Sequence, residues 1–523
     1  MKKAISLFYL LSFGLLLNAQ KYDNTWLWGF KPELQDSTIL RRGNSQGQFI
    51  GNNFIVSDVP REMIFDYTNH TFCDVDGNLL FYTNGMRIKD SASHNTINGD
   101  SLNYGSFWEY CRTQELQGYY SYSVAYSHFA LPQPQHDSIF YLFHERADTI
   151  PPVWKGSMCY SVIKKRTDGK LEASKKNQLL STVRPTCGGV NACRHANGRD
   201  WWILYMQVET NCVNKFLLTP DTLVFISSQC LGTTYDWTDG IKSYFSLDGS
   251  VFVKTGTAHG TDIYSFDRCS CDLQLLHHLN PVFEIDSFSG ATIDYIEGSD
   301  LSANNRYLYL CMSRFVFQYD LEAPDVEASL DTVGTVDYFT DTVYASGGKY
   351  YFNFTQYGPD GKIYIGPKGG CRFMSTIDFP DSGGVSCHVG VRSVVLTKLD
   401  AFSLQFSPNY RLGRLLGSAC DTIYSDIKPL YTQPPWLKVF PNPATDEVQF
   451  DYNWVEWESI EDLKLKIEDL SGRVVMEQQI PKYSTKQNFS VKQLAAGVYT
   501  VQLYGNGLSG NKVSIANCKL VKQ

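Results

Sequence analysis

The sequence predicts an all-β protein, because its composition and its local pattern both favour strands. Of its 523 residues, 14% are aromatic, with 33 Tyr and 31 Phe, and 19% are charged. Aromatic side chains are enriched in strands, where they pack well on a pleated surface. Short alternating apolar runs bounded by Gly, Asn and Asp recur along the chain, and residues 1–420 contain no long amphipathic helical pattern.

One sequence pattern, an Asp-Gly turn followed directly by an apolar strand, recurs through most of the chain. It is clearest at residues 357–368, returns at 73–82 and 245–253, and is looser at 301–310. Gly accepts positive φ at no steric cost, so Asp-Gly is a strong hairpin signal. Repetition at a fixed period is typical of β-propellers, whose small sheets bury both faces only when they stack. We therefore predict an N-terminal β-propeller over residues 21–420 with about seven blades, while six or eight remain open.

The blades can be assigned in order along this region. The pattern predicts them within residues 65–89, 121–180, 195–206, 242–267, 295–321 and 350–379, and a seventh from residues 402–406 joined to N-terminal strands. Residues 22–60 are expected to supply a strand that pairs with the far end of the propeller. Such a strand would close the ring and remove an open sheet edge.

Residues 1–20 predict a secretory signal peptide. Lys2 and Lys3 precede an apolar run at 4–17, and small or polar residues follow it. No comparable apolar run comes later, so we expect no integral membrane segment after cleavage. The net charge of -8 lacks the basic footprint of a nucleic-acid binder, so no nucleic-acid partner is expected.

The 14 cysteines of an exported chain predict disulfides. Three pairs close short loops: Cys187 with Cys193, Cys212 with Cys230, and Cys371 with Cys387. Cys269 and Cys271 are too close to pair comfortably, so each is expected to reach a different partner. There is no Cys-x-x-Cys motif and His195 is a lone neighbour of Cys193, so the sequence predicts no metal site.

A second domain follows a linker at residues 421–436, which is polar and contains Pro429, Pro434 and Pro435. Residues 437–523 contain three runs that alternate with period two, with turns at Gly472 and Gly497. This pattern predicts a small C-terminal β-sandwich.

Three motifs of this domain carry a resemblance: Phe-Pro-Asn-Pro-Ala-Thr-Asp at 440–446, Asp-Leu-Ser-Gly-Arg-Val-Val at 469–475, and Leu-Ala-Ala-Gly-Val-Tyr-Thr-Val-Gln-Leu at 494–503. The domain resembles the type A C-terminal sorting domain of the type IX secretion system. Its motif residues are Pro441, Asn442, Pro443, Asp446, Gly472, Gly497 and Tyr499. The resemblance implies export through the periplasm, recognition of residues 437–523 by the type IX secretion machinery, and a secreted or outer cell-surface location.

The preceding region resembles the propellers of large surface and gliding-associated proteins of the same bacteria, on the segments 76–85, 195–202, 357–365 and 408–413. That resemblance implies no particular reaction. An Asp followed by Ser or Thr also resembles the O-glycosylation sequon of those bacteria, although turn chemistry explains the pattern equally well. The hypothesised glycan sites are Ser37, Ser91, Thr332, Thr342 and Thr422.

A ligand of a propeller is expected where inner strands meet the central funnel. Candidate binding residues near blade starts are Arg184, Arg194, His195, Tyr235, Trp237, His259, Asp294 and Glu297. A glycosidase needs two carboxylates roughly 5 to 10 Å apart. Asp294 and Glu297 are the nearby acidic pair, but in a strand they would point to opposite faces, as expected of a solvated turn.

The sequence lacks a nucleophile elbow, a phosphate-binding loop, a metalloprotease helix motif and a sialidase Asp box. We therefore predict no catalytic residues and no cofactor. The expected function is non-enzymatic, with the propeller presenting a protein- or glycan-binding face. A secreted polysaccharide hydrolase or lyase with its site in the funnel is the alternative, and an apolar, plugged funnel would favour a structural role.

Overall fold

The structure is a computed structural model of the chain. It describes residues 20–30, 43–61, 63–116, 121–148, 155–235, 240–257, 259–280, 295–337, 340–341, 348–368, 371–400, 404–421, 436–453, 460–481, 484, 486–507 and 512–523. The chain forms two compact units, Met1–Ile423 and Tyr424–Gln523. The predicted signal peptide, except Gln20, and the predicted linker between Asp421 and Trp436 lie outside the described residues.

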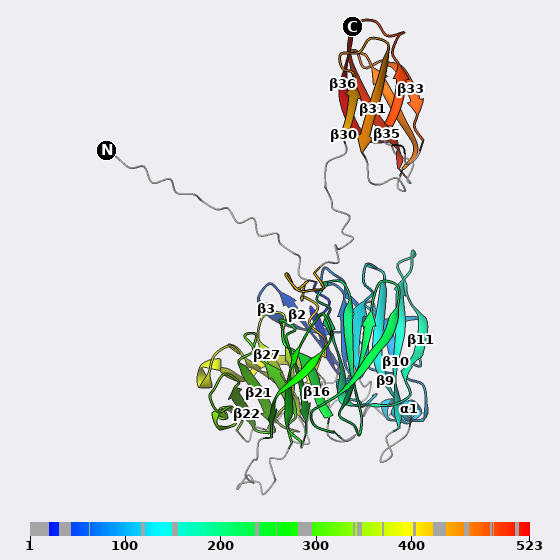
Figure 1. Cartoon of the computed structure of the whole chain (residues 1–523). Coiled ribbons are helices and arrows are strands. Elements are labelled where there is room, and N and C mark those ends of the chain that lie inside the picture. The colour runs from blue at the N-terminus through cyan, green and yellow to red at the C-terminus, as the bar shows by residue number, and fades with distance from the viewer. Residues whose placement is uncertain are drawn as a thin grey trace, which may run out of the picture. The chain divides into compact units, whose positions relative to one another are not determined.

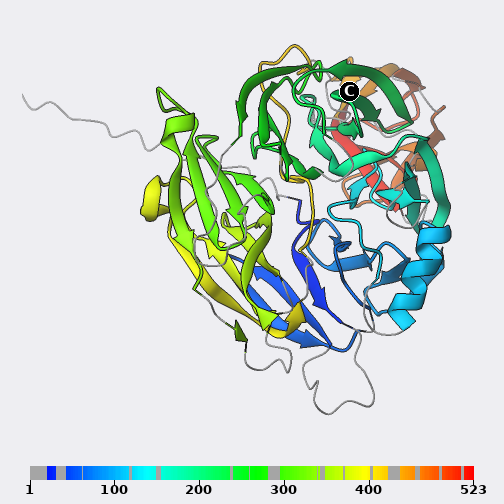
Figure 2. The same ribbon diagram turned by 90° about the horizontal axis from the view of Figure 1, so that it is seen from below.

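The first unit is a β-propeller (Figures 1 and 2). Its N-terminal sheet has three strands, β1 (Thr25–Gly29), β2 (Asn44–Ile50) and β3 (Asn53–Val59). An eight-stranded sheet follows, formed by two four-stranded blades. The first comprises β4 (His70–Cys73), β5 (Leu79–Thr83), β6 (Arg87–Asp90) and β7 (Asn95–Asp100), and the second β8 (His128–Pro132), β9 (Ile139–Ala147), β10 (Gly156–Lys165) and β11 (Leu171–Ser181). A parallel pairing of Ile97 with Glu172 joins their outer strands.

Four more four-stranded blades complete the ring. They are β12 (Pro185–Arg194), β13 (Trp201–Gln207), β14 (Cys212–Leu218) and β15 (Leu223–Cys230); β16 (Gly240–Phe245), β17 (Val251–Gly256), β18 (Thr261–Phe266) and β19 (Leu273–Leu279); β20 (Gly298–Leu301), β21 (Tyr307–Met312), β22 (Phe315–Asp320) and β23 (Asp331–Thr335); and β26 (Tyr351–Tyr357), β27 (Ile363–Lys368), β28 (Cys371–Ile377) and β29 (Val389–Asp400). The predicted all-β fold with about seven blades is confirmed, with seven blades in the described part of the chain.

Three short elements and one helix lie between the strands. The ribbon β24 (Thr340–Asp341) and β25 (Gly348–Lys349) precedes β26, and the 3-10 turns are η1 (Glu327–Ser329) and η2 (Gly384–Cys387). Helix α1 (Ser106–Leu116) was not predicted. It buries Phe107, Trp108 and Cys111, which pack with Met86 and Tyr122 beside β4 to β7.

The recurring Asp-Gly pattern forms the hairpins that join the first and second strands of three blades. Gly77, Gly249 and Gly361 have φ of 93°, 72° and 86°, and Asn305 takes φ of 62° in the looser fourth copy. A Cβ at Gly249 would lie 2.7 Å from Leu412, so glycine is also needed there for close packing. All four turns lie at the face where the inner strands end, which we call the exit face.

Closure of the ring differs from the prediction. β1, β2 and β3 pair with one another and form the seventh blade alone, so the described residues between 22 and 60 supply no strand to another sheet. The blade is tied to β29 by side chains: Ser45 Oγ lies 3.0 Å from Thr397 Oγ1 and accepts the Lys398 N–H at 2.8 Å. Lys398 Nζ lies 3.1 Å from Asp58.

Residues 404–406 belong to no blade, which corrects the predicted seventh; residues 402 and 403 lie outside the described part. Instead, residues 404–413, which we call the strap, lie between the inner strands of the blades (Figure 2, the gold trace between the blades), and residues 409–413 reach the turns of the exit face. Gln405 Oε1 accepts the backbone N–H of Thr71 at 2.9 Å, and Gln405 Nε2 donates to the Thr71 carbonyl at 2.8 Å. Tyr410 Oη donates to Ala130 O at 2.7 Å. These bonds let a polar strap lie buried in the channel.

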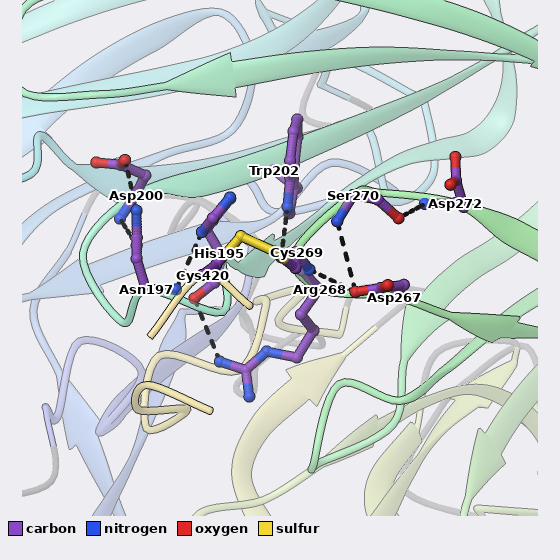
Figure 3. The surroundings of a disulfide bond; sticks show 10 residues. All are labelled: His195, Asn197, Asp200, Trp202, Asp267, Arg268, Cys269, Ser270, Asp272 and Cys420. Carbon is purple, nitrogen blue, oxygen red and sulfur yellow. Dashed lines mark hydrogen bonds between the residues drawn. A yellow bond between two sulfur atoms is a disulfide. The ribbon is translucent and has the colours of Figure 1, made fainter. Parts of the chain in front are cut away.

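Beyond the strap, the chain is fastened at the exit face. Cys420 forms a disulfide with Cys269 in the turn before β19 (Figure 3). The adjacent Arg268 donates to Arg194 O at 2.9 Å and to Gly413 O, and its carbonyl accepts Trp202 Nε1–H at 2.8 Å. The end of the propeller chain is therefore held by covalent and polar contacts together.

The disulfide predictions had mixed outcomes. Cys212 and Cys230 are bonded and lie directly opposite each other on β14 and β15, as predicted. Cys193 and Cys387 are free, buried thiols, so the predicted bonds to Cys187 and Cys371 are wrong. Cys193 packs among Trp202, Phe252 and Phe266 in the core between two blades. Cys269 reaches a distant partner as predicted, whereas Cys271 is a free, buried thiol.

The second unit consists of two sheets. One contains β30 (Trp436–Phe440), β31 (Glu447–Asn453) and β34 (Lys486–Ser490), and the other β33 (Val474–Gln479), β32 (Ile460–Glu468), β35 (Gly497–Gly507) and β36 (Lys512–Lys522). Their alternating apolar side chains form one core that includes Phe450, Leu465, Val501 and Leu520. The predicted small β-sandwich is confirmed.

Candidate functional site

A cleft of about 500 Å³ opens at the exit face of the propeller. Inner strands β12, β16, β20 and β26 form its floor, and the first hairpin turns of three successive blades form one side. The strap forms the other side, with residues 406–413. Volumes of roughly 300 to 1,000 Å³ are typical of small-molecule sites, so the strap narrows the funnel to a ligand-sized cleft.

A buried ion pair lies at the floor of the cleft. Lys242 Nζ donates to Asp300 Oδ2 and to Thr355 O, each at 2.8 Å. The side chains are 2% and 6% exposed, and the ammonium lies 4.9 Å from the Tyr244 ring centre. Burial lowers the pKa of Lys242, and Asp300 opposes that shift. Burial likewise raises the pKa of Asp300, opposed by Lys242. The charges of Lys242 and Asp300 neutralise each other, and the hydrogen bonds of Lys242 join three blades.

A second ion pair fixes the strap. Arg411 Nη1 and Nη2 donate to the two oxygens of Asp23 at 2.7 and 2.6 Å, a bidentate geometry that holds both groups strongly. Asn409 Nδ2 donates to Leu247 O at 2.7 Å in the β16–β17 turn. The wall of the cleft is therefore held to the N-terminal residues and to a neighbouring blade.

One polar atom of the cleft has no partner. Gln356, on β26, is 7% exposed, and its Nε2 donates weakly to Ser407 O at 3.4 Å and Tyr357 O at 3.3 Å. Its Oε1 is buried and finds no hydrogen-bond donor in the described part of the chain. An unpaired buried acceptor costs free energy that a ligand donor would recover.

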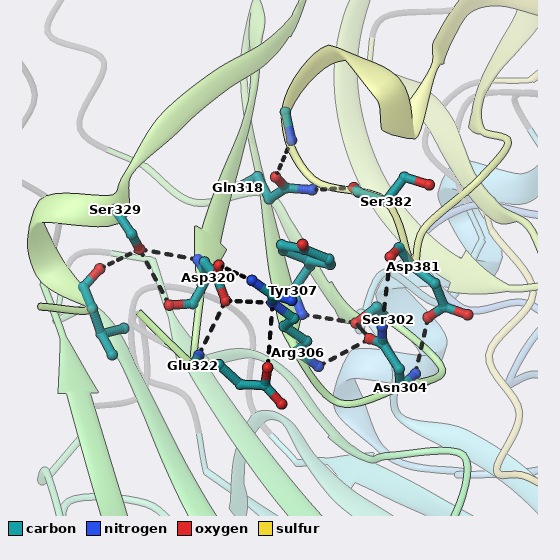
Figure 4. A network of polar contacts seen from close by, with 12 residues as sticks. Ser302, Asn304, Arg306, Tyr307, Gln318, Asp320, Glu322, Ser329, Asp381 and Ser382 are labelled. Atoms are coloured by element: carbon teal, nitrogen blue, oxygen red, sulfur yellow. Dashed lines mark hydrogen bonds and ion pairs between the residues drawn. The ribbon is translucent and has the colours of Figure 1, made fainter. Parts of the chain in front are cut away.

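The turn before β21 is fixed by a polar network (Figure 4). Asp381, which is exposed at the rim of the cleft, accepts the Asn304 N–H at 2.9 Å. Arg306 donates twice to Asp320, at 2.9 and 2.8 Å, and these bonds hold the pKa of Asp320 below its usual value. Gln318 Nε2 donates to Ser382 O at 2.9 Å. The rim beside Ala303 is therefore preformed.

The predicted binding residues that the structure describes do not line this cleft. Arg194 and His195 lie at the exit face, beside the Arg268 contacts that hold the end of the strap. The Arg194 guanidinium stacks 3.8 Å from the centre of the Trp201 ring, and His195 Nδ1 accepts the Asn197 N–H at 3.0 Å. Burial lowers the pKa of His195. These groups stabilise turns.

The other predicted residues lie toward the opposite face. Arg184 pairs with buried Glu145, Glu297 pairs with Lys368, and Tyr235 Oη donates to Gly260 O at 3.2 Å beside His259. Trp237 and Asp294 lie outside the described residues, so the suggested Asp294–Glu297 pair stays untested. The described residues contain no group of three or more His, Cys, Asp or Glu placed to hold a metal ion.

Sequence reasoning missed Lys242, Asp300, Gln356 and the strap. The available signal was the position of polar residues within strands that are otherwise apolar, since an inner strand turns one face toward the channel. The hypothesised glycan sites Ser91 and Thr332 are exposed and stay predictions. Ser37, Thr342 and Thr422 lie outside the described residues.

The motif residues of the second unit stabilise its own fold. Asn442 Nδ2 donates to Lys519 O at 2.8 Å and its Oδ1 accepts the Val521 N–H at 2.9 Å, so the first motif holds the last strand. Tyr499 Oη donates to Ala495 O at 2.8 Å, and Gly472 takes φ of 81° in a tight turn. Their direct contact with the export machinery stays a prediction.

These features define a two-part β protein: a propeller followed by a sandwich. Residues 438–516 match the family described as secretion system C-terminal sorting domain. The chain therefore carries a type IX sorting domain, which directs it to the cell surface or the extracellular space and makes the secretion machinery its partner. In the residues that the structure describes, no helix has the length and apolar character needed to cross a membrane.

No curated protein sequence matches the chain. Among solved structures, a putative 6-phosphogluconolactonase from Bacteroides uniformis is 12% identical, covers 67% of this chain and 91% of its own, and has a TM-score of 0.38. PorZ, a surface component of the type-IX secretion system of Porphyromonas gingivalis, is 13% identical over 92% of this chain and 63% of its own, with a TM-score of 0.31. The propeller domain of Myceliophteria thermophila Swd1 is 9% identical over 62% and 90%, with a TM-score of 0.33. At these values none indicates a function.

Proposed function

We propose that the propeller is a non-enzymatic binding module, presented on the cell surface or released outside the cell, and that the exit-face cleft is its ligand site. The observation that carries this proposal is Gln356 Oε1, a buried acceptor without a partner inside a preformed, ligand-sized cleft.

The carboxylates of the cleft favour binding over hydrolysis. Asp300 is held by Lys242 and Asp23 by Arg411, whereas a glycosidase needs an acid and a base or nucleophile that can exchange protons with substrate. Asp381 lies exposed at the rim, where its oxygen already accepts a backbone N–H.

Filling the cleft tests the proposal. Ala303 lines the mouth of the cleft, so Ala303→Trp should reduce binding of the full-length protein to whole cells and extracellular polysaccharide of its own organism by at least tenfold. Ala323→Trp, in an outer turn of the same blade, is the matched control. Equal binding by the wild-type and Ala303→Trp proteins would exclude the cleft as the site, and product release from the polysaccharide would favour the hydrolase alternative.

A further inference from the structure

The charges that line the cleft are compensated within the protein. Lys242 and Arg411, the cations among the lining residues, each contact a carboxylate at 2.8 Å or less. Asp381 adds an exposed negative charge at the rim. An anionic ligand would therefore lose water without gaining an available counter-ion, and it would approach the exposed carboxylate of Asp381.

The hydrogen-bonding groups of the cleft call for a donor on the ligand. Gln356 Oε1 is an acceptor that has no hydrogen-bond donor in the described part of the chain. Ser407 Oγ accepts an N–H from Gln405 at 2.8 Å and lies within hydrogen-bonding reach of the Tyr410 hydroxyl. Half-buried Phe245 and Tyr357 add aromatic surface to the lining. Ligand hydroxyl groups, which donate and accept, match this set.

The walls and volume of the cleft limit the size of its ligand. Its sides are hairpin turns and the strap, and its floor is made of the innermost strands of four blades. The volume suits the end of a chain rather than the broad face of a folded partner.

We propose that the cleft binds the end of an uncharged saccharide chain through Gln356 Oε1. This inference rests on the proposed function and adds the ligand class and the residue that recognises it. Discrimination against acidic sugars follows from the internal pairing of Lys242 and Arg411, together with the charge of Asp381.

Calorimetric titration of the full-length protein tests this proposal. The probes are short neutral oligosaccharides of glucose, mannose, galactose and xylose, and their uronic acid counterparts. We expect at least one neutral probe to bind at least tenfold more tightly than its acidic counterpart. Gln356→Leu should weaken that binding about tenfold, because it removes the acceptor. Gln178→Leu, on the exposed outer strand β11, should leave it unchanged.

A surface variant covers the case in which Gln356→Leu fails to fold. Asp381→Lys replaces an exposed negative charge with a positive one and should shift the preference toward acidic probes. Tighter binding of acidic or aminated probes by the wild-type protein would overturn the inference. So would absence of any saccharide binding while Ala303→Trp still abolishes binding to cells, which would leave the proposed function standing. No effect of Ala303→Trp on cells would instead reject the proposed function itself.

Discussion

Removal of the Cys269–Cys420 disulfide should destabilise the propeller more than removal of Cys212–Cys230. The first bond joins residues 151 apart and the second residues 18 apart. Each bond restricts the unfolded chain, and the chain-entropy relation gives about 5 kcal/mol for the longer loop and about 3 kcal/mol for the shorter one. The Cys269→Ser/Cys420→Ser protein should therefore be about 2 kcal/mol less stable than the Cys212→Ser/Cys230→Ser protein.

Guanidinium unfolding without reductant, followed by near-ultraviolet circular dichroism, measures this difference. Cys518→Ser, which replaces a free thiol of the sandwich, is the control and should leave the propeller transition unchanged. An equal loss from both double variants, or a larger loss from the Cys212–Cys230 pair, would refute the reasoning. It would mean that the polar contacts of Arg268 and Arg411 restrain the strap equally well without the bond.

Three further predictions concern other side chains. Lys242→Met leaves Asp300 buried without its counter-ion, so the free energy of unfolding should fall by about 3 to 5 kcal/mol, and Lys242→Met/Asp300→Leu should recover much of it. Burial lowers the pKa of His70 to about 4 and of His144 to about 3, so the unfolded chain binds more protons below pH 6.5. Stability should then fall as pH drops from about 6.5 to 4, by up to about 1.4 kcal/mol per pH unit for each histidine; pH-independent melts in that range would contradict it. Asn442→Ala removes two hydrogen bonds to β36 and should lower the melting temperature of the sandwich and the secreted fraction; unchanged values of both would count against a structural role of the motif.

The turns of the propeller could be predicted because their chemistry is local. Asp-Gly at residues 248–249 and 360–361 requires nothing from the rest of the chain to form a hairpin, and the sheet patterns between such turns were equally clear. The paired Cys212 and Cys230 were also a local signal, since both lie in one short hairpin.

The cleft could not be predicted because it is built from contacts between distant residues. Gln405 lies in an alternating polar and apolar stretch typical of a strand, and its partner Thr71 lies 334 residues earlier. Nothing near Gln405 shows that the channel will satisfy its amide, so a strand in the seventh blade was the simpler interpretation. The same limit explains Cys193: sequence distance to Cys187 says nothing of the direction of its side chain, which faces the core between two blades.

The position of the strap in the sequence also fixes the order in which the parts of the propeller can assemble. It follows all seven blades along the chain, so during synthesis the channel can be filled only after every blade has emerged. Contacts that span more than 300 residues form slowly because of the long loops they close. The sorting sandwich follows the strap and the linker along the chain, so the signal for export becomes available only once the last segment of the propeller has been made.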